Sequence, residues 1–101
     1  MPALPAWELA ADKRSISRSF TAKNFVAAID FFSGVKDVAE AEGHHPDLHL
    51  TDYRSVRIEV STHAVGGLTM FDLILAAKLD EVEVVYSPKW LREREAAAKP
   101  A

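Results

Sequence analysis

The stretch Gly43-His44-His45-Pro46-Asp47 decides the fold, because it marks the change from a helix to a strand. Glycine is favoured directly after a helix, where the backbone takes a positive φ. Proline fixes its own φ and pushes the residue before it toward an extended backbone. The pattern therefore predicts a helix that ends at Gly43 and a strand that begins just after Pro46. The two histidines are expected on a short, stiff connection at the edge of a sheet.

Upstream of this connection, the sequence predicts a hairpin followed by a helix. Trp7-Glu8-Leu9 and residues 15–20 are typical of two short strands, and Arg18 is expected as a charge that protects a sheet edge from pairing. Thr21 is expected to be the N-cap of the helix. The predicted core face of this helix comprises Phe25, Ile29, Phe32, Val35 and Ala39, widened by Val26 and Phe31.

Gly34 lies in the middle of this predicted helix, where glycine costs about 1 kcal/mol relative to alanine. Two interpretations stay open for it. Either a close helix–helix approach, for example at an oligomer interface, offsets the cost, or the position is a tolerated weak spot.

Downstream, the sequence predicts a second hairpin and a second helix. Residues 48–53 and 54–61 are the two strands, and apolar residues alternate with polar ones in the second. Thr69 and Asp72 have the spacing of a capping box at the start of the helix. Its predicted core face comprises Leu75, Leu79, Val82 and Tyr86, and Ser87-Pro88 is expected to end it.

The order strand, strand, helix, strand, strand, helix predicts an α+β fold. Its four-stranded antiparallel sheet would carry the helices on one face. The 101 residues fit a single domain over 1–101, with a core from about 7 to 86 and a tail from 87 to 101. The tail is expected either to form a loose extra helix with Trp90 and Leu91 docked, or to fray.

Composition excludes several classes of function. The net charge of −3 argues against a direct nucleic-acid binder, and the absence of cysteine excludes a disulfide framework and a cysteine-based zinc site. No apolar run approaches the roughly 18 residues that a membrane helix needs. The N-terminus lacks the features of a signal peptide, so the expected location is the cytoplasm, with an organelle or the nucleus left open.

The histidines are the candidate chemical groups, because imidazole gives and takes protons near neutral pH. His44, His45 and His63 are candidates for general acid–base catalysis, and Asp72 is a candidate to orient a histidine as well as a helix cap. A zinc site is a less favoured interpretation, because adjacent side chains on extended backbone point to opposite faces. For His49 a role as an ordinary strand residue is expected.

These residues form a multi-part pattern. Glu40 is followed after three residues by His44-His45-Pro46, then by Tyr53 after six more, His63 after nine and Asp72 after eight. The pattern resembles that of the pterin-4a-carbinolamine dehydratases, also described as dimerisation cofactors of a homeodomain transcription factor. The resemblance covers roughly residues 7–86 and includes Ser61-Thr62-His63 and Gly67-Leu68-Thr69.

The resemblance implies dehydration of a 4a-hydroxytetrahydropterin to quinonoid dihydropterin, a hydro-lyase reaction that recycles the cofactor of aromatic amino acid hydroxylases. The pterin is the substrate, and neither a bound cofactor nor a metal is implied. His44 and His63 would act as acid–base groups on opposite faces of the pterin, His45 would hold it, and Asp72 would support the histidines. The remaining pocket residues implied are Gly43, Ser61, Thr62 and Ala64, which would line the pocket largely through their backbone.

The family forms dimers and tetramers, so the resemblance also implies a homo-oligomer. A rival hypothesis is a non-catalytic interaction module on the same scaffold, either a transcriptional coactivator or an assembly factor for another enzyme. Such a module need not keep its histidines, and this chain has all three. The sequence therefore favours the enzyme.

Overall fold

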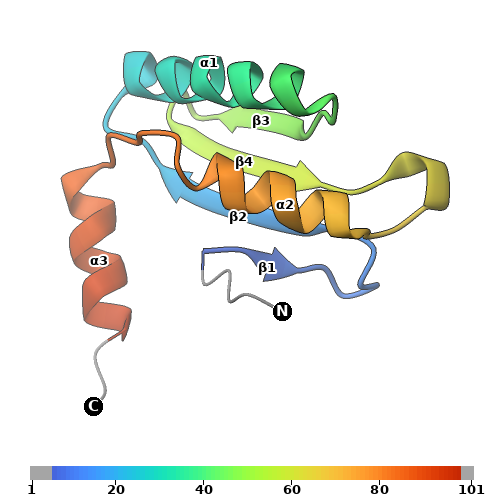
Figure 1. Cartoon of the computed structure of the whole chain (residues 1–101). Helices are drawn as coiled ribbons and strands as arrows, with labels where there is room; N and C mark the ends of the chain where they lie inside the picture. The colour runs from blue at the N-terminus through green and yellow to red at the C-terminus, as the bar shows by residue number, and fades with distance from the viewer. Residues whose placement is uncertain (1–5, 99–101) are drawn as a thin grey trace.

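A computed structural model describes residues 6–98, without the side chains of residues 63, 97 and 98. The chain follows the predicted order, with a short 3-10 helix and a third α-helix added (Figure 1). The ends of the predicted domain, residues 1–5 and 99–101, lie outside the described part. The elements are β1 Glu8–Leu9, β2 Ile16–Thr21, α1 Phe25–Glu42, β3 Asp47–Thr51, β4 Ser55–Val60, η1 His63–Val65, α2 Met70–Leu79 and α3 Pro88–Ala98.

The strands form one antiparallel sheet in the order β1-β2-β4-β3, which confirms the predicted α+β fold. In its centre Ile16 pairs with Val60 and Phe20 pairs with Val56. Side chains alternate between the two faces of a strand. One face of β2 and β4 is therefore buried and, apart from Arg18, apolar, as the alternation in β4 predicted.

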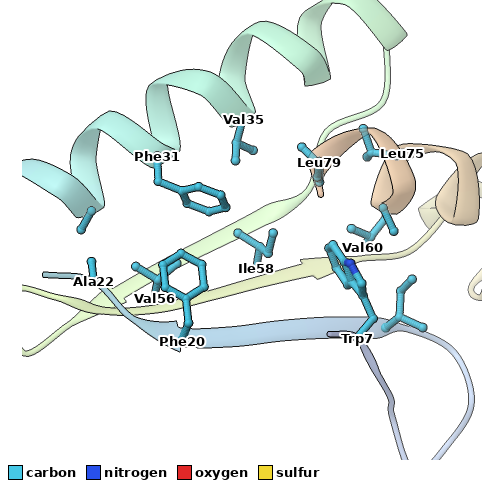
Figure 2. Close-up of a cluster of buried hydrophobic side chains, with 13 residues drawn as sticks. Trp7, Phe20, Ala22, Phe31, Val35, Val56, Ile58, Val60, Leu75 and Leu79 are labelled. Atoms are coloured by element: carbon cyan, nitrogen blue, oxygen red, sulfur yellow. The ribbon is translucent and has the colours of Figure 1, made fainter. Parts of the chain in front are cut away.

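The two main helices cover this apolar face of the sheet (Figure 1). Phe31 and Val35 from α1 and Leu79 from α2 point into the same cluster as Ile58 of β4 (Figure 2). All four are almost completely excluded from water. Burial of such side chains contributes about 1.5–3 kcal/mol each relative to an exposed position. This shared core fixes where the first turn of α2 lies relative to the end of α1.

The start of α1 corrects the sequence prediction. Asn24, and not Thr21, is the N-cap: its side-chain oxygen accepts a hydrogen bond from the Ala27 amide at 2.8 Å. Thr21 is the last residue of β2, and its carbonyl accepts a hydrogen bond from the Ser87 amide at 2.9 Å. Strand β2 therefore extends to Thr21, where the segment at Ser87 supplies a backbone hydrogen-bond donor. The preference of threonine for N-cap positions gives no information on such a distant partner.

The core face of α1 is also partly different from the prediction. Val35 and Ala39 are buried as expected, but Phe25 and Ile29 are 52% and 44% exposed. Of the two residues expected to widen this face, Phe31 is buried and Val26 is 64% exposed. Ala28, which was not predicted, is buried as well. Both sets of residues repeat at a spacing of three or four, so the period alone does not select between them. A small residue, Ala28, faces the sheet and allows the helix to approach it.

The second helix is shorter than predicted, because α2 ends at Leu79 with Asp80 as its C-cap. Residues 81–86 then alternate between exposed and half-buried, and Tyr86 pairs with Ala22 in an isolated antiparallel bridge. An alternation with period two is typical of extended chain, so this segment was wrongly assigned to the helix.

The tail forms α3, which extends away from the sheet (Figure 1). Trp90 stacks on Tyr86 with ring centroids 5.2 Å apart, whereas Leu91 is 45% exposed. The extra helix is thus present, and of the two residues expected to dock Trp90 does so.

Arg18 is not an exposed charge that protects a sheet edge, because it is paired with Asp80. Its side chain is buried on the helix-covered face. Gly34 is explained by a close approach within the chain: a Cβ atom there would lie 2.6 Å from Cγ1 of Val82. The close contact is with the segment after α2, and a neighbouring molecule is not needed to explain it.

Candidate functional site

Asp72 is the centre of the candidate site, and its position follows from the start of α2. Thr69 is the N-cap, and Asp72 is the third helical residue, so the two form the predicted capping box. The Asp72 side chain is fully buried. Its Oδ2 accepts a hydrogen bond from the Thr69 amide at 2.8 Å. An acidic side chain here is also stabilised by the positive end of the helix dipole.

His44 reaches Asp72 because α1 ends where the sequence predicted. Gly43 has φ +64°, a left-handed conformation that favours glycine, and it turns the chain out of the helix. The His44 amide still bonds to the Ala39 carbonyl at 3.2 Å, which fixes the start of the connection. The His44 Nε2 atom lies 2.5 Å from Asp72 Oδ1, and the His44 side chain is 21% exposed. A buried carboxylate therefore holds a partly accessible imidazole.

Thr62 joins the same group from the other side. Its hydroxyl donates to Asp72 Oδ2 at 2.8 Å and lies 2.9 Å from the hydroxyl of Thr69. Its amide donates to the Gly67 carbonyl at 2.8 Å, so the backbone here closes a turn around η1. The sequence argument placed Thr62 in the pocket mainly through its backbone. The structure shows its side chain bound to Asp72 and its amide already used.

His45 points to a different partner from His44. Its Nε2 lies 3.2 Å from Oε2 of Glu40, and both side chains are mostly exposed. This separation agrees with the rule that neighbours on extended backbone face opposite ways. The structure therefore brings His44 and Asp72 together but does not bring His45 into that contact.

The remaining predicted site residues have no hydrogen bond to Asp72 among the side chains that the structure describes. His63 begins η1 directly after Thr62, so its backbone adjoins the group around Asp72, but its side chain lies outside the described part. Ser61 is half-buried, Ala64 is exposed, and a Cβ at Gly43 would meet open space. His49 is an exposed residue of β3, as expected.

One cavity lies beside the start of α2, and its lining residues, among the side chains that the structure describes, include no histidine. It has a volume of about 510 Å³ and a mainly apolar lining. Thr69 lines it and is also part of the Asp72 group, so this threonine lies between the cavity and the candidate site. The lining comprises Trp7, Leu9, Lys13, Ile16, Leu68, Thr69, Met70 and Leu73.

The side chains that the structure describes contain no cluster of three or more residues suited to hold a metal ion. The side chain of His63 is not among them, so a zinc site that includes His63 stays a less favoured prediction. Over residues 6–98, no helix combines the length and the apolar character needed to cross a membrane.

Sequence reasoning missed the hydroxyls of Thr62 and Thr69. For Thr69 a signal existed, because the capping-box spacing already linked it to Asp72. Thr62 is ten residues from Asp72 and lies in an isolated bridge after the end of β4, and no local pattern relates the two. The pairing of His45 with Glu40 was also not expected.

Comparison with known proteins shows the family to which this chain is similar. The family model for pterin 4 alpha carbinolamine dehydratase matches residues 1–82. Pterin-4-alpha-carbinolamine dehydratase 2, mitochondrial, of Arabidopsis thaliana is 52% identical over 80 residues, which are 77% of this chain and 43% of the relative. The chain thus spans less than half the length of that plant relative.

Two solved structures have the same fold. A protein of Brucella melitensis, described as a transcriptional coactivator/pterin dehydratase, is 30% identical with a TM-score of 0.72, and the match covers 78% of this chain and 83% of that one. A pterin dehydratase-like protein, described as a RuBisCO assembly factor in the alpha-carboxysome, is 15% identical with a TM-score of 0.63 over 76% and 88% of the two chains. The second likeness shows the fold alone. The family match over residues 1–82 shows that the chain belongs to the pterin-4-alpha-carbinolamine dehydratase family.

Proposed function

We propose that this chain dehydrates a 4a-hydroxytetrahydropterin to quinonoid dihydropterin. The observation that carries the proposal is the 2.5 Å contact between His44 Nε2 and Oδ1 of the fully buried Asp72. A carboxylate that orients an imidazole is a common way to build a general acid or base. Membership of the dehydratase family supplies the substrate class.

The reaction needs two proton transfers and no redox step. One proton is delivered to the departing 4a-hydroxyl, so that the C4a–O bond breaks and water leaves. The proton on N5 is then lost, and its electron pair forms the C4a=N5 double bond. Proton transfer by a positioned side chain typically contributes 10²–10⁴-fold. Two imidazoles with opposite tasks would account for the whole reaction.

We assign these tasks to His44 and His63, on opposite faces of the pterin, with His45 holding the substrate. The support for His44 is its contact with Asp72 and its partial exposure. The support for His63 is the position of its backbone beside Thr62. The pterin would lie against Gly43, Ser61, Thr62 and Ala64. We expect a homo-oligomer that serves an aromatic amino acid hydroxylase by regenerating its spent cofactor.

The test is the disappearance of a 4a-hydroxytetrahydropterin, generated in the cuvette and followed by ultraviolet absorbance with purified protein. We expect dehydration faster than in buffer at neutral pH, and a loss of about 10²–10³ in kcat for His44→Ala. His49→Ala is the matched control, because it removes a histidine on exposed β3. Dehydration no faster than in buffer, or a His44→Ala protein as active as the parent, would refute the proposal.

The rival function is a non-catalytic interaction module, and one observation supports it. Met70 and Phe71, beside Asp72 on α2, are 65% and 70% exposed. Exposed apolar side chains of this kind mark many protein interfaces. A stoichiometric protein partner, together with no pterin binding by calorimetry, would favour this rival.

A further inference from the structure

The two oxygens of the Asp72 carboxylate have different partners. Oδ2 accepts from the Thr62 hydroxyl and from the Thr69 amide, each at 2.8 Å. Oδ1 faces His44 Nε2 at 2.5 Å. Because Asp72 is fully buried, these protein groups take the place of water around the carboxylate. One oxygen is therefore fixed by the fold, and the other is directed at the imidazole.

The number of available protons decides which hydroxyl donates to which. A threonine hydroxyl has one proton to donate and accepts with its lone pairs. The Thr62 proton goes to Asp72 Oδ2, because a carboxylate oxygen at 2.8 Å is an acceptor only. The 2.9 Å contact between the two hydroxyls must then be a donation from Thr69 to Thr62. The other acceptor within reach of the Thr69 hydroxyl, Asp72 Oδ2, is farther away at 3.5 Å.

The same count fixes the proton on His44. An ionised carboxylate oxygen only accepts, so His44 Nε2 must carry a hydrogen when the ring faces Asp72 Oδ1. In the neutral ring the second nitrogen, Nδ1, is then the unprotonated one. The nitrogen that exchanges a proton with a substrate is therefore Nδ1, and Nε2 keeps its proton throughout.

We propose that Thr62 is a positioning residue whose hydroxyl, itself oriented by Thr69, locks Asp72 so that His44 keeps its proton on Nε2 and works through Nδ1. The kinetic part of this proposal rests on the proposed dehydratase function. The part that concerns the ring does not, because it describes the free protein. The contact from Thr62 goes beyond helix capping, since the Thr69 amide already supplies the capping donor.

The first test is the protonation pattern of His44 in the free protein. Long-range proton–nitrogen NMR correlation distinguishes the two neutral tautomers, and the chain has 4 histidines, so the spectrum is small. Loss of one ring system in His44→Gln assigns the signals. At a pH where the ring is neutral, we expect protonated Nε2 and bare Nδ1 in the parent. A parent protein with the proton on Nδ1 would overturn the proposal.

The second test removes and restores the Thr62 hydroxyl. Thr62→Val keeps the shape of the side chain but not its proton, and Thr62→Ser keeps the proton. We expect Thr62→Val to populate both His44 tautomers and to lower kcat about 10-fold, within the range for the loss of such a supporting group. The change in KM should stay below about two-fold, because the lost hydroxyl bonds to Asp72 and the proposed contact of Thr62 with the pterin is through its backbone. Thr62→Ser should restore both readouts.

Thr51→Val is the matched control, because it makes the same replacement on exposed β3. It should leave the tautomer and kcat unchanged. A Thr62→Val protein with the parent tautomer and the parent kcat would overturn the role of Thr62. If Thr62→Val does not fold, Thr62→Ala and the parent spectrum decide the same question.

The two proposals fail in different ways. If the tautomer changes with Thr62→Val but no variant dehydrates a pterin, the proposed function is wrong and the positioning role stands. If the parent is an active dehydratase and Thr62→Val changes neither the His44 tautomer nor kcat, the proposed function stands and the positioning role is wrong.

Discussion

Helix α2 has an acidic residue near each end, of which Asp72 is fully buried and Asp80 is partly exposed, and the two are held in different ways. Asp72, in the first turn, contacts an imidazole and two threonines. Asp80, at the C-cap, accepts from Arg18 Nη1 at 3.1 Å and from Trp7 Nε1 at 2.9 Å. The helix dipole favours a carboxylate at the first position and disfavours it at the second. Asp80 therefore needs a full positive charge beside it, whereas Asp72 does not.

The partners of the two carboxylates differ in whether they are able to exchange a proton near neutral pH. Guanidinium stays charged at any ordinary pH, and the indole N–H only donates, so no proton moves around Asp80. Imidazole exchanges protons near neutrality, so the contact with Asp72 is able to take part in a reaction. Arg18 also donates to the Tyr86 hydroxyl at 2.6 Å. The hydrogen bonds among Trp7, Arg18, Asp80 and Tyr86 thus join three parts of the chain. These parts are the segment before β1, strand β2 and the segment after α2.

The largest effect is expected at Asp72. Asp72→Asn keeps the size of the side chain but replaces one acceptor oxygen by an NH₂ donor, so His44 is no longer held in one tautomer. We expect kcat for pterin dehydration to fall about 10²–10³-fold, which is about 3–4 kcal/mol. Steady-state kinetics with thermal unfolding as a companion measurement checks this. An Asp72→Asn protein with parent kcat would mean that Asp72 is a helix cap and no more.

Asp80→Asn should show the reverse pattern. Without the negative charge, the Arg18 guanidinium stays buried beside a neutral amide. We expect a loss of about 2–3 kcal/mol in the free energy of unfolding, below the full cost of a broken buried ion pair because Asp80 is 31% exposed. Urea denaturation measures it, and kcat per folded molecule should not change.

A second replacement serves as the control for Asp80→Asn. Adding Arg18→Met removes the unpaired cation and keeps an unbranched apolar side chain, so part of the lost stability should return. If the double variant is less stable than Asp80→Asn by the full cost of Arg18→Met alone, the two residues are not coupled.

Next in size is the packing of the segment that follows Asp80. Gly34→Ala would place a Cβ 2.6 Å from Val82 Cγ1, and β-branched valine has few alternative rotamers. Overpacking costs about 1–3 kcal/mol, from which the helix propensity of alanine returns up to about 1 kcal/mol. We expect a net loss of about 1–2 kcal/mol by urea denaturation. Combined with Val82→Ala the substitution should cost little, and an additive double variant would contradict the contact.

A smaller effect is expected at Tyr86, which ends this segment. Tyr86→Phe removes the oxygen bound to Arg18 and keeps the ring stacked on Trp90. A hydrogen bond to a charged group contributes roughly 1.5–3 kcal/mol, and partial access of water reduces this to about 1 kcal/mol. Equal unfolding free energies for the variant and the parent would show that Arg18 depends on Asp80 alone.

The two ends of α2 also differ in how well the sequence predicts them. The β4 strand, the Gly43 helix end and the Thr69–Asp72 capping box follow from residues within one or two turns of each other, and the structure confirms them. The end of α2 depends on contacts that join residues 62 and 73 positions apart along the chain. No periodicity in a single sequence encodes such partners.

The candidate site divides in the same manner. His44 and Asp72 belong to a pattern that the sequence resemblance already contained, and the structure shows that they touch. The hydroxyl of Thr62 was not part of that reasoning, because its contact with Asp72 exists only once β4 and α2 have packed together. The catalytic roles of the histidines remain predictions, and the experiments above address them.

The smallest effect is expected at a third carboxylate, Glu40, which tests whether contact with a histidine is enough to make a site. Its Oε2 lies 3.2 Å from His45 Nε2, but the two side chains are 70% and 65% exposed. Exposed ion pairs contribute about 0–1 kcal/mol because water screens them. Glu40→Gln should therefore change the unfolding free energy by less than about 0.5 kcal/mol and kcat by less than about two-fold. A loss comparable to that of Asp72→Asn would show that burial is not what distinguishes the Asp72 site, because an exposed carboxylate would then orient a histidine equally well.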